Sequence, residues 1–351
     1  MAERWAVATG NANATATWNG GTLPAIDDDV YANGFTVTVN VNTHWKNAYT
    51  LAGTTAVAGG GFTLSNGVTL TLNNGNGEAR AGSTTCVTFA GTTGNSATLI
   101  GHPIGSATTG SRYGVSNTSS GTLNITGNPT GGAAASAFGV LNNSTGTVNV
   151  TGNPSAGAGS ASAGTRNAST GTLNITGTVT GNAAGMAAYW ASGGGTVTGT
   201  VTGGTASSTS GLQNAGSGTI TIVGSVVGGS AAIAIGALNS SSGTITVTGN
   251  ATGGSNATAY GASNTGTGTL TVNGKAISNV GPGVNSSVTG STTIASAEMG
   301  TNRVFPYAGK VAFIDLSVAT LGVRDSSGTL VTLSAGGVKN VFHPPSVFGA
   351  T

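Results

Sequence analysis

Residues able to do acid–base chemistry are few, and they lie toward the two ends of this 351-residue chain. The sequence holds ten Lys and Arg, eight Asp and Glu and three His residues. From Gly121 to Gly274 there is no Asp, Glu, His or Lys, and Arg166 is the sole charged residue. Polysaccharide lyases and hydrolases need paired carboxylates or a base beside a metal ion. We therefore expect a non-enzymatic protein with no catalytic residues.

The remaining candidate groups have structural interpretations. The three consecutive carboxylates Asp27–Asp29 lack the spaced oxygen ligands and distal Glu of a calcium loop, so we predict that they cap a turn. His44, His102 and His343 lie far apart in the sequence, and we interpret each as a surface or hydrogen-bonded histidine. The single Cys86 excludes an intrachain disulfide framework and reads as a small buried hydrophobe. We predict no metal-binding residues, no cofactor-binding residues and no cofactor.

Two short motifs repeat with the same period. A Gly-Thr-apolar-x-apolar unit returns at intervals of 25, 25, 24, 23, 25 and 25 residues, beginning at Gly121, Gly146, Gly171, Gly195, Gly218, Gly243 and Gly268. A Gly-x-x-Asn unit keeps the same period, at Gly114/Asn117, Gly139/Asn142, Gly164/Asn167, Gly211/Asn214, Gly236/Asn239 and Gly261/Asn264. One copy departs, with Ala188 and Ala191 in the Gly and Asn places. Two motifs on one period predict an all-β fold, a parallel β-helix (β-solenoid) with rungs of about 25 residues.

Each rung contains a strand with one apolar face. Side chains alternate across a strand, so Leu123 and Ile125 share the inner face while the intervening Thr and Asn residues face outward. The fourth copy is weaker, because Gly199 replaces the second apolar residue after Val197. A second strand is expected around Ala137–Val140. The repeated Asn residues are expected to stack at one bend and to bond to neighbouring amides and local backbone.

Outward-facing threonines form regular ranks. The first rank comprises Thr122, Thr147, Thr172, Thr196, Thr219, Thr244 and Thr269. The second rank lies two residues further along each strand and comprises Asn124, Asn149, Asn174, Thr198, Thr221, Thr246 and Thr271. Such ranks resemble those of ice-binding β-solenoids, whereas a simpler interpretation is that Thr favours strands and solvates an exposed face. We favour the simpler interpretation, because Asn interrupts the second rank. The departing copy, with Tyr189 and Trp190, is the one place on the rungs where we expect a local contact.

The chain divides by composition into three parts. Residues 1–60 are predicted to form an N-terminal cap and attachment segment, and residues 61–290 the β-helix, with regular rungs over 121–285. Charges return in residues 291–351, which we predict to form a small C-terminal β module. Apolar runs on either side of Asp325–Gly328 predict a hairpin there.

Several partner classes are disfavoured by composition. No basic patch is available to follow a phosphate backbone, so we expect no nucleic-acid binding. The longest apolar runs are far shorter than a membrane span, so we expect no membrane insertion. The first residues, Met1 to Trp5, contain no apolar signal region, so we expect no export. Abundant Gly (63 residues) occurs in disordered chains too, but apolar residues recurring in phase favour order.

Two segments carry a resemblance to known proteins. Thr17-Trp18-Asn-Gly-Gly-Thr-Leu-Pro24, followed by Asp27–Asp29 and an alternating strand up to Asn40, resembles the opening segment of many right-handed parallel β-helices. The last residues, His343-Pro-Pro-Ser-Val-Phe-Gly349, resemble a Pro-x-Ser-Val-x-x-Gly ending of phage appendage proteins. Together with the Gly/Thr/Asn/Ser-rich repeat, they make the chain resemble bacteriophage virion structural proteins.

That resemblance implies a tail fibre, head fibre or capsid-decoration protein, located in the virion and assembled in the host cytoplasm. The implied partners are other virion proteins of the capsid or tail, a host surface glycan or receptor, and further copies of the chain in a homotrimer. We expect the N-terminal end to dock on the particle and the other end to aid host attachment. A bacterial cell-surface adhesin and an ice-binding β-solenoid remain alternatives.

Overall fold

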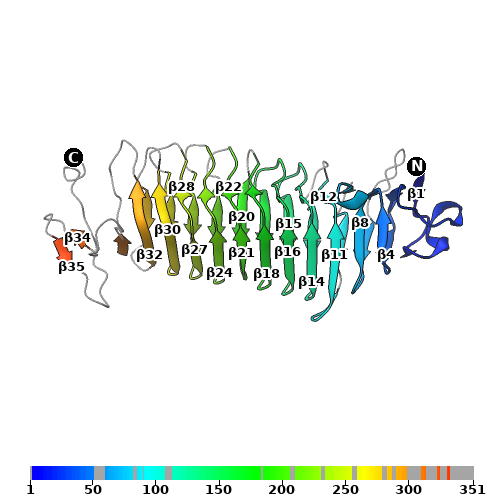
Figure 1. The fold of residues 1–351 in the computed structure, drawn as a ribbon, viewed down its shortest axis with the longest axis horizontal. Helices are drawn as coiled ribbons and strands as arrows, with labels where there is room; N and C mark the ends of the chain where they lie inside the picture. The colour runs from blue at the N-terminus through cyan, green and yellow to red at the C-terminus, as the bar shows by residue number, and fades with distance from the viewer. Residues whose placement is uncertain are drawn as a thin grey trace. The chain divides into compact units, whose positions relative to one another are not determined.

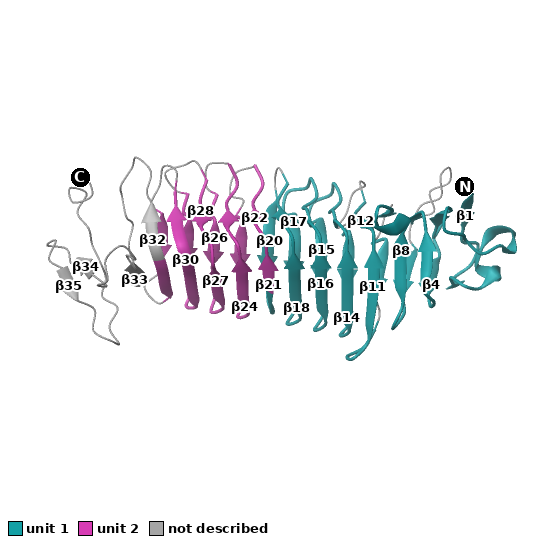
Figure 2. Cartoon of the chain, viewed as in Figure 1, with its two compact units in different colours: residues 1–195 teal, residues 196–351 magenta. Residues whose placement is uncertain are grey.

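The computed structural model describes residues 2–50, 60–81, 85–89, 91–106, 113–182, 185–205, 210–230, 234–254, 259–278, 283–286 and 290–294, and the backbone alone of 295–298, 310–313, 322–324 and 330–332. The chain forms two units, Met1–Gly195 and Thr196–Thr351, coloured separately in Figure 2. Both are all-β solenoids with parallel sheets and rungs of about 25 residues, and together they contain about ten turns. The predicted fold class is confirmed.

Unit 1 stacks its strands in three columns (Figure 1). The first column contains β1 (Glu3–Trp5), β3 (Asp29–Tyr31), β6 (Asn47–Tyr49), β9 (Glu78–Arg80) and β12 (His102–Ile104). The second contains β2 (Gly10–Asn11), β4 (Thr36–Val39), β7 (Gly61–Leu64), β10 (Val87–Phe89), β13 (Val115–Asn117), β15 (Phe138–Asn142), β17 (Ala163–Asn167) and β20 (Met186–Trp190). The third contains β5 (Thr43–Trp45), β8 (Thr69–Leu72), β11 (Ser96–Ile100), β14 (Thr122–Thr126), β16 (Thr147–Thr151) and β18 (Thr172–Thr176).

Short elements complete unit 1. Single parallel bridges continue the first column from Ile104 through Thr130 and Ser155 to Thr180, in β19 (Val179–Thr180). Three short 3-10 turns also occur among the described residues: η1 (Thr15–Thr17), η2 (Asn19–Gly21) and η3 (Asn73–Gly75). β21 (Gly194–Thr198) spans the boundary between the units.

Unit 2 repeats the same arrangement. One column contains β23 (Leu212–Asn214), β26 (Ala237–Asn239), β29 (Ala262–Asn264) and β31 (Val284–Ser286). A second contains β24 (Thr219–Val223), β27 (Thr244–Val247), β30 (Thr269–Ile277), β32 (Ser291–Glu298) and β33 (Lys310–Phe313). The third contains β22 (Val201–Thr202), β25 (Val226–Val227), β28 (Ala251–Thr252) and the end of β30. Parallel pairing therefore continues past Ser291 into the C-terminal residues.

The predicted C-terminal hairpin is confirmed in its strands. β34 (Gly322–Arg324) pairs antiparallel with β35 (Leu330–Thr332), with Val323 opposite Val331. Residues 325–329, where the turn was predicted, lie outside the described residues, as does His343.

Residues of the same kind stack along each column because consecutive strands pair in register. Thr122, Leu123, Asn124 and Ile125 lie opposite Thr147, Val148, Asn149 and Val150 of the next turn. Leu123 and Ile125 are almost completely buried, as their alternation predicts. The solenoid core is therefore a set of apolar rows that run from turn to turn and exclude water.

Aromatic side chains fill the core at the N-terminal turns. Trp18 is 1% exposed and packs edge-on against Trp45, with ring centroids 5.9 Å apart. Trp45 in turn lies 5.4 Å from Phe62. Trp18 also donates its indole N–H to the Ala12 carbonyl, at 2.8 Å. Because β5 is the first strand of its column, Trp18 covers the core at the point where the stack begins.

The predicted asparagine ladder is present, and all six members are fully buried. Asn142 donates its Nδ2 to the carbonyl of Gly146 (3.0 Å) and to that of Thr172 in the next turn (3.3 Å). The same bond to the glycine four residues later is made by Asn167, Asn214, Asn239 and Asn264. A direct amide–amide bond joins Asn117 to Asn142, at 3.1 Å. Backbone carbonyls are therefore the main partners, and each amide ties the bend of its own turn.

A column of glycines accompanies the ladder. Gly101, Gly127, Gly152 and Gly177 have φ between +142° and +152°, a conformation that side chains with a Cβ rarely adopt. A Cβ added to Gly152 would overlap the carbonyl oxygen of Gly127, one turn earlier. Both backbone angle and space therefore require glycine here.

The departing copy has a different alignment from the one predicted. Asn167 lies opposite Trp190, so Ala187 and Trp190, rather than Ala188 and Ala191, take the Gly and Asn places. Trp190 is fully buried, and its Nε1 donates to the Gly194 carbonyl at 3.3 Å. It thus keeps the bond to the carbonyl four residues later that each Asn makes. Because Trp190 is buried, it is not the surface contact that we expected.

The strand after Trp190 is shifted as well. An added Cβ at Gly193 would meet the carbonyl of Gly171, and one at Gly195 would meet that of Leu173. The opening glycine of this turn is therefore Gly193, and Gly195 replaces the first apolar residue, not the second. Val197, fully buried, takes the second apolar place, and Gly199 has φ +145° like the glycines of the column.

We predict that Gly152→Ala lowers the free energy of unfolding by about 3 kcal/mol, because it adds both a strained backbone angle and an overlap. The matched control is Gly67→Ala, at φ +73° with no atom within 4 Å of the added Cβ, where about 1 kcal/mol is expected. Thermal unfolding followed by circular dichroism measures both. Equal losses would contradict the role given to the glycine column.

Removal of one ladder amide gives a second prediction. Asn142→Ala leaves the carbonyls of Gly146 and Thr172 without this donor and should cost about 3 kcal/mol. The neighbouring Asn143 is exposed, and Asn143→Ala should change stability by less than about 0.5 kcal/mol. Denaturant titration of the two variants distinguishes them, and a stable Asn142→Ala protein would show that the ladder is dispensable.

Candidate functional site

Of the three N-terminal aspartates, Asp28 caps a turn, as predicted. Asp28 accepts hydrogen bonds from the backbone N–H groups of Ala2 and Ala25, both at 3.0 Å, and from Arg4 Nε at 3.4 Å. Burial opposes ionisation of Asp28, but these donors outweigh it and hold the pKa of the carboxyl below its usual value of 3.8. Asp27 is exposed.

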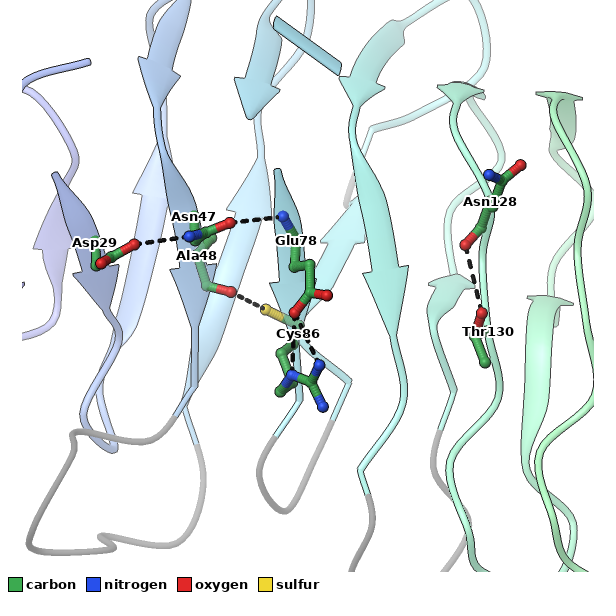
Figure 3. A network of polar contacts seen from close by, with 8 residues as sticks. Asp29, Asn47, Ala48, Glu78, Cys86, Asn128 and Thr130 are labelled. Atoms are coloured by element: carbon green, nitrogen blue, oxygen red, sulfur yellow. Dashed lines mark hydrogen bonds and ion pairs between the residues drawn. The ribbon is translucent and has the colours of Figure 1, made fainter. Parts of the chain in front are cut away.

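Asp29 belongs to a chain of polar contacts between successive turns (Figure 3). It accepts hydrogen bonds from Asn47 Nδ2 at 2.7 Å and from Lys46 Nζ at 3.3 Å. Asn47 accepts the backbone N–H of Glu78, whose carboxylate pairs with Arg80 at 2.8 Å. The carboxylates of Asp29 and Glu78 are thus bonded to side chains of the chain itself.

Neighbouring tyrosines line the same column. Tyr31 stacks on Tyr49 with ring centroids 5.1 Å apart, and its hydroxyl donates to Glu3 at 3.3 Å. Burial and the negative charges of Glu3 and Asp29 raise the pKa of Tyr31 to about 12. The phenol therefore stays protonated in the physiological range.

Two histidines and the cysteine have structural partners. His102 Nδ1 accepts the backbone N–H of Asn128 at 3.0 Å, and His44 Nε2 accepts that of Asn74 at 3.3 Å. Each imidazole thus bonds to a later segment of the stack, which agrees with the hydrogen-bonded interpretation. Cys86 is fully buried with Sγ 3.6 Å from the Ala48 carbonyl, and burial raises the pKa of its thiol. Its prediction as a buried hydrophobe is confirmed.

The threonine ranks are regular within each unit but interrupted at the departing copy. Thr122, Thr147 and Thr172 are in register in unit 1. Gly194 takes the position that follows Thr172 in the first rank, so the prediction of an unbroken rank is wrong. Thr196 and Thr198 each lie two residues further along their strand than predicted. In the second rank the amides of Asn124, Asn149 and Asn174 form an outer ladder with bonds of 2.9 and 3.0 Å.

The most distinctive surface feature is a stack of side chains that we call the Arg166 clamp, comprising Tyr113, Phe138, Arg166 and Tyr189. Four successive turns of unit 1 contribute one member each. Tyr113 stacks on Phe138 with ring centroids 5.5 Å apart and planes 5° from parallel. The Arg166 guanidinium lies 5.1 Å from the Phe138 ring centre and 5.4 Å from that of Tyr189. The cation is therefore held between two aromatic rings.

The clamp lies outside the solenoid core. Arg166 and Tyr189 are opposite each other in register and alternate with the inward-facing Asn167 and Trp190. Phe138 is only 3% exposed because Arg166 and its neighbours cover it, whereas Arg166, Tyr113 and Tyr189 are partly exposed.

Arg166 has no counter-charge within the described residues. Arg4, Lys46 and Arg80 of the same unit each pair with a carboxylate. Arg166 makes no such pair there, and its buried Nε has no hydrogen-bond partner in the described structure. A buried donor left without a partner costs about 1–3 kcal/mol. The clamp thus presents a positive charge that no carboxylate of the described residues pairs with.

The sequence predicts a contact at Tyr189 but not the partners of this residue. The available signals were that Arg166 is the sole charge of the repeat region and that Tyr113 and Phe138 each precede a ladder Asn by four residues.

Comparisons with protein-family models, with curated proteins and with solved structures gave no match. Among the described residues, no helix is long and apolar enough to cross a bilayer. In the same residues no three His, Cys, Asp or Glu side chains are grouped so that they could hold a metal ion.

The lowered pKa of Asp28 leads to a pH prediction. Since its folded value lies below 3.8, Asp28 stabilises the N-terminal turns above that pH, and this contribution is lost as the pH falls through the folded value. Asp28→Asn should lower stability at pH 7 and flatten the acid limb of the profile, whereas Asp27→Asn should leave it unchanged. Hydrogen exchange of the first 30 residues from pH 2 to 7 measures this, and identical profiles for both variants would refute it.

Proposed function

We propose that the chain is a non-enzymatic structural protein of a bacteriophage virion, a fibre or decoration protein that projects from the particle and aids attachment to the host surface. One observation carries the proposal. The buried amides and glycines of the rungs serve to hold turn on turn, and from Gly121 to Gly274 the sequence adds a single charge. Such a body suits a passive spacer better than a reaction site.

The N-terminal end is the favoured attachment point. The described part of the chain has six exposed large hydrophobic residues, and five are Trp5, Val7, Leu23, Ile26 and Val41, between 39% and 50% exposed. β1 is also the first strand of its column, so one edge has no partner strand among the described residues. Apolar side chains beside an open strand edge suit a contact with a capsid or tail protein.

We also propose a homotrimer assembled in the host cytoplasm. The described rungs expose one large hydrophobic residue, Val223, so contacts between copies along the rungs would be mainly polar. Light scattering of the purified chain measures the copy number.

Virions of the phage that encodes the chain provide the test. Deletion of the gene should remove a projection from negatively stained particles and lower adsorption to host cells, and expression of the intact chain in trans should restore both. Unchanged particles would refute the virion assignment.

Attachment through the N-terminal end is tested in the same complementation. Trp5→Ser with Ile26→Ser should leave a folded chain that no longer incorporates. The control Val223→Ser changes a residue of intermediate exposure, 45% against 39% for Trp5 and 50% for Ile26, and should incorporate normally. Normal incorporation of the double variant would place the docking surface elsewhere.

A further inference from the structure

We infer that the Arg166 clamp is a binding site for a carboxylate-bearing saccharide, such as a uronate or sialate unit of a bacterial or host surface polymer. This inference rests on the proposed attachment role and names the ligand class. The observation behind it is a cation that is fixed between two rings and has no counter-charge in the described structure.

The charge selects an anion. From Gly121 to Gly274 the chain holds no acidic residue, so no nearby part of the sequence can supply a carboxylate to Arg166. A guanidinium presents paired N–H donors that match a carboxylate in a bidentate geometry. Contact with two rings restricts the guanidinium in advance, which lowers the entropy lost when a ligand binds.

The rings select a saccharide. Tyr113 and Tyr189 at the two ends of the clamp are partly exposed, and their faces are apolar while their hydroxyl groups can donate or accept hydrogen bonds. A pyranose ring has the same character, with apolar C–H faces and a polar rim. The three spacings of about 4.8 Å between its four turns give the clamp a length of roughly 14 Å, which suits several units of a linear polymer.

A single positive charge argues against a nucleic acid, because a phosphate backbone needs a row of cations. The residues that precede Arg166 in the same column, Ser116 and Leu141, are uncharged. The contact is therefore local and directed at one carboxylate per site.

The test measures binding of oligogalacturonate and of oligosialate to the purified full chain by isothermal calorimetry. At least one should bind, more weakly at high salt, and its methyl ester should not. Arg166→Leu keeps an aliphatic cover over Phe138 but removes the charge, and should weaken binding at least tenfold. Tyr189→Ala should weaken it as well. Unchanged thermal unfolding of each variant confirms that it folds.

Arg80→Leu is the matched control, because it removes the same charge from another arginine of the unit. Equal weakening by Arg80→Leu and Arg166→Leu would show general charge attraction and overturn the site, as would binding of neither saccharide. Binding of an acidic peptide but of neither saccharide would assign the clamp to a protein partner instead. Particle images test the virion assignment separately, so either proposal can fail alone.

Discussion

Axial stacking at hydrogen-bond distance is the constraint on which the whole structure depends. Successive turns lie about 4.8 Å apart, so every residue contacts its counterpart one turn before and one turn after. A column therefore accepts only residues that stack on their own kind. Gly152 over Gly127 leaves no room for a Cβ, and Asn142 donates to a carbonyl of its own turn and to one of the next. The sequence repeat follows from this spacing.

The same constraint explains why the regular turns of the solenoid contain so few ionisable residues. An ionisable residue repeated in an inner column would place like charges about 4.8 Å apart in a low dielectric, which is strongly unfavourable. Uncharged Asn, Thr and Gly avoid that repulsion while satisfying the backbone. In the irregular first turns, ionisable residues are tolerated because opposite charges pair, Asp29 with Lys46 and Glu78 with Arg80.

Stacking also determines which features of the structure the sequence predicts. The period, the inward Leu and Ile pairs and the Asn ladder were predictable, since each depends on stacking alone. The register of the departing copy was not, because Gly195-Thr196 matches the motif by residue type while Gly193 takes the structural place. The clamp was hidden for another reason. Phe138 and Asn142 differ by four positions, and this even spacing predicts that both side chains face the core. The Phe138 ring nevertheless contacts the outward-facing Arg166.

A solenoid turn interacts mainly with its two neighbours, so a substituted turn perturbs little beyond them. The turn with Trp190 illustrates this, because Trp190 retains the bond of the replaced Asn while Gly195 removes a large side chain from the adjoining strand. The same turn places Tyr189 against Arg166 on the outer face. A break in the repeat thus changes the surface without loss of the stack. Since each column otherwise repeats the same kind of residue, the irregular turn is where side chains for binding a ligand differ from the repeat.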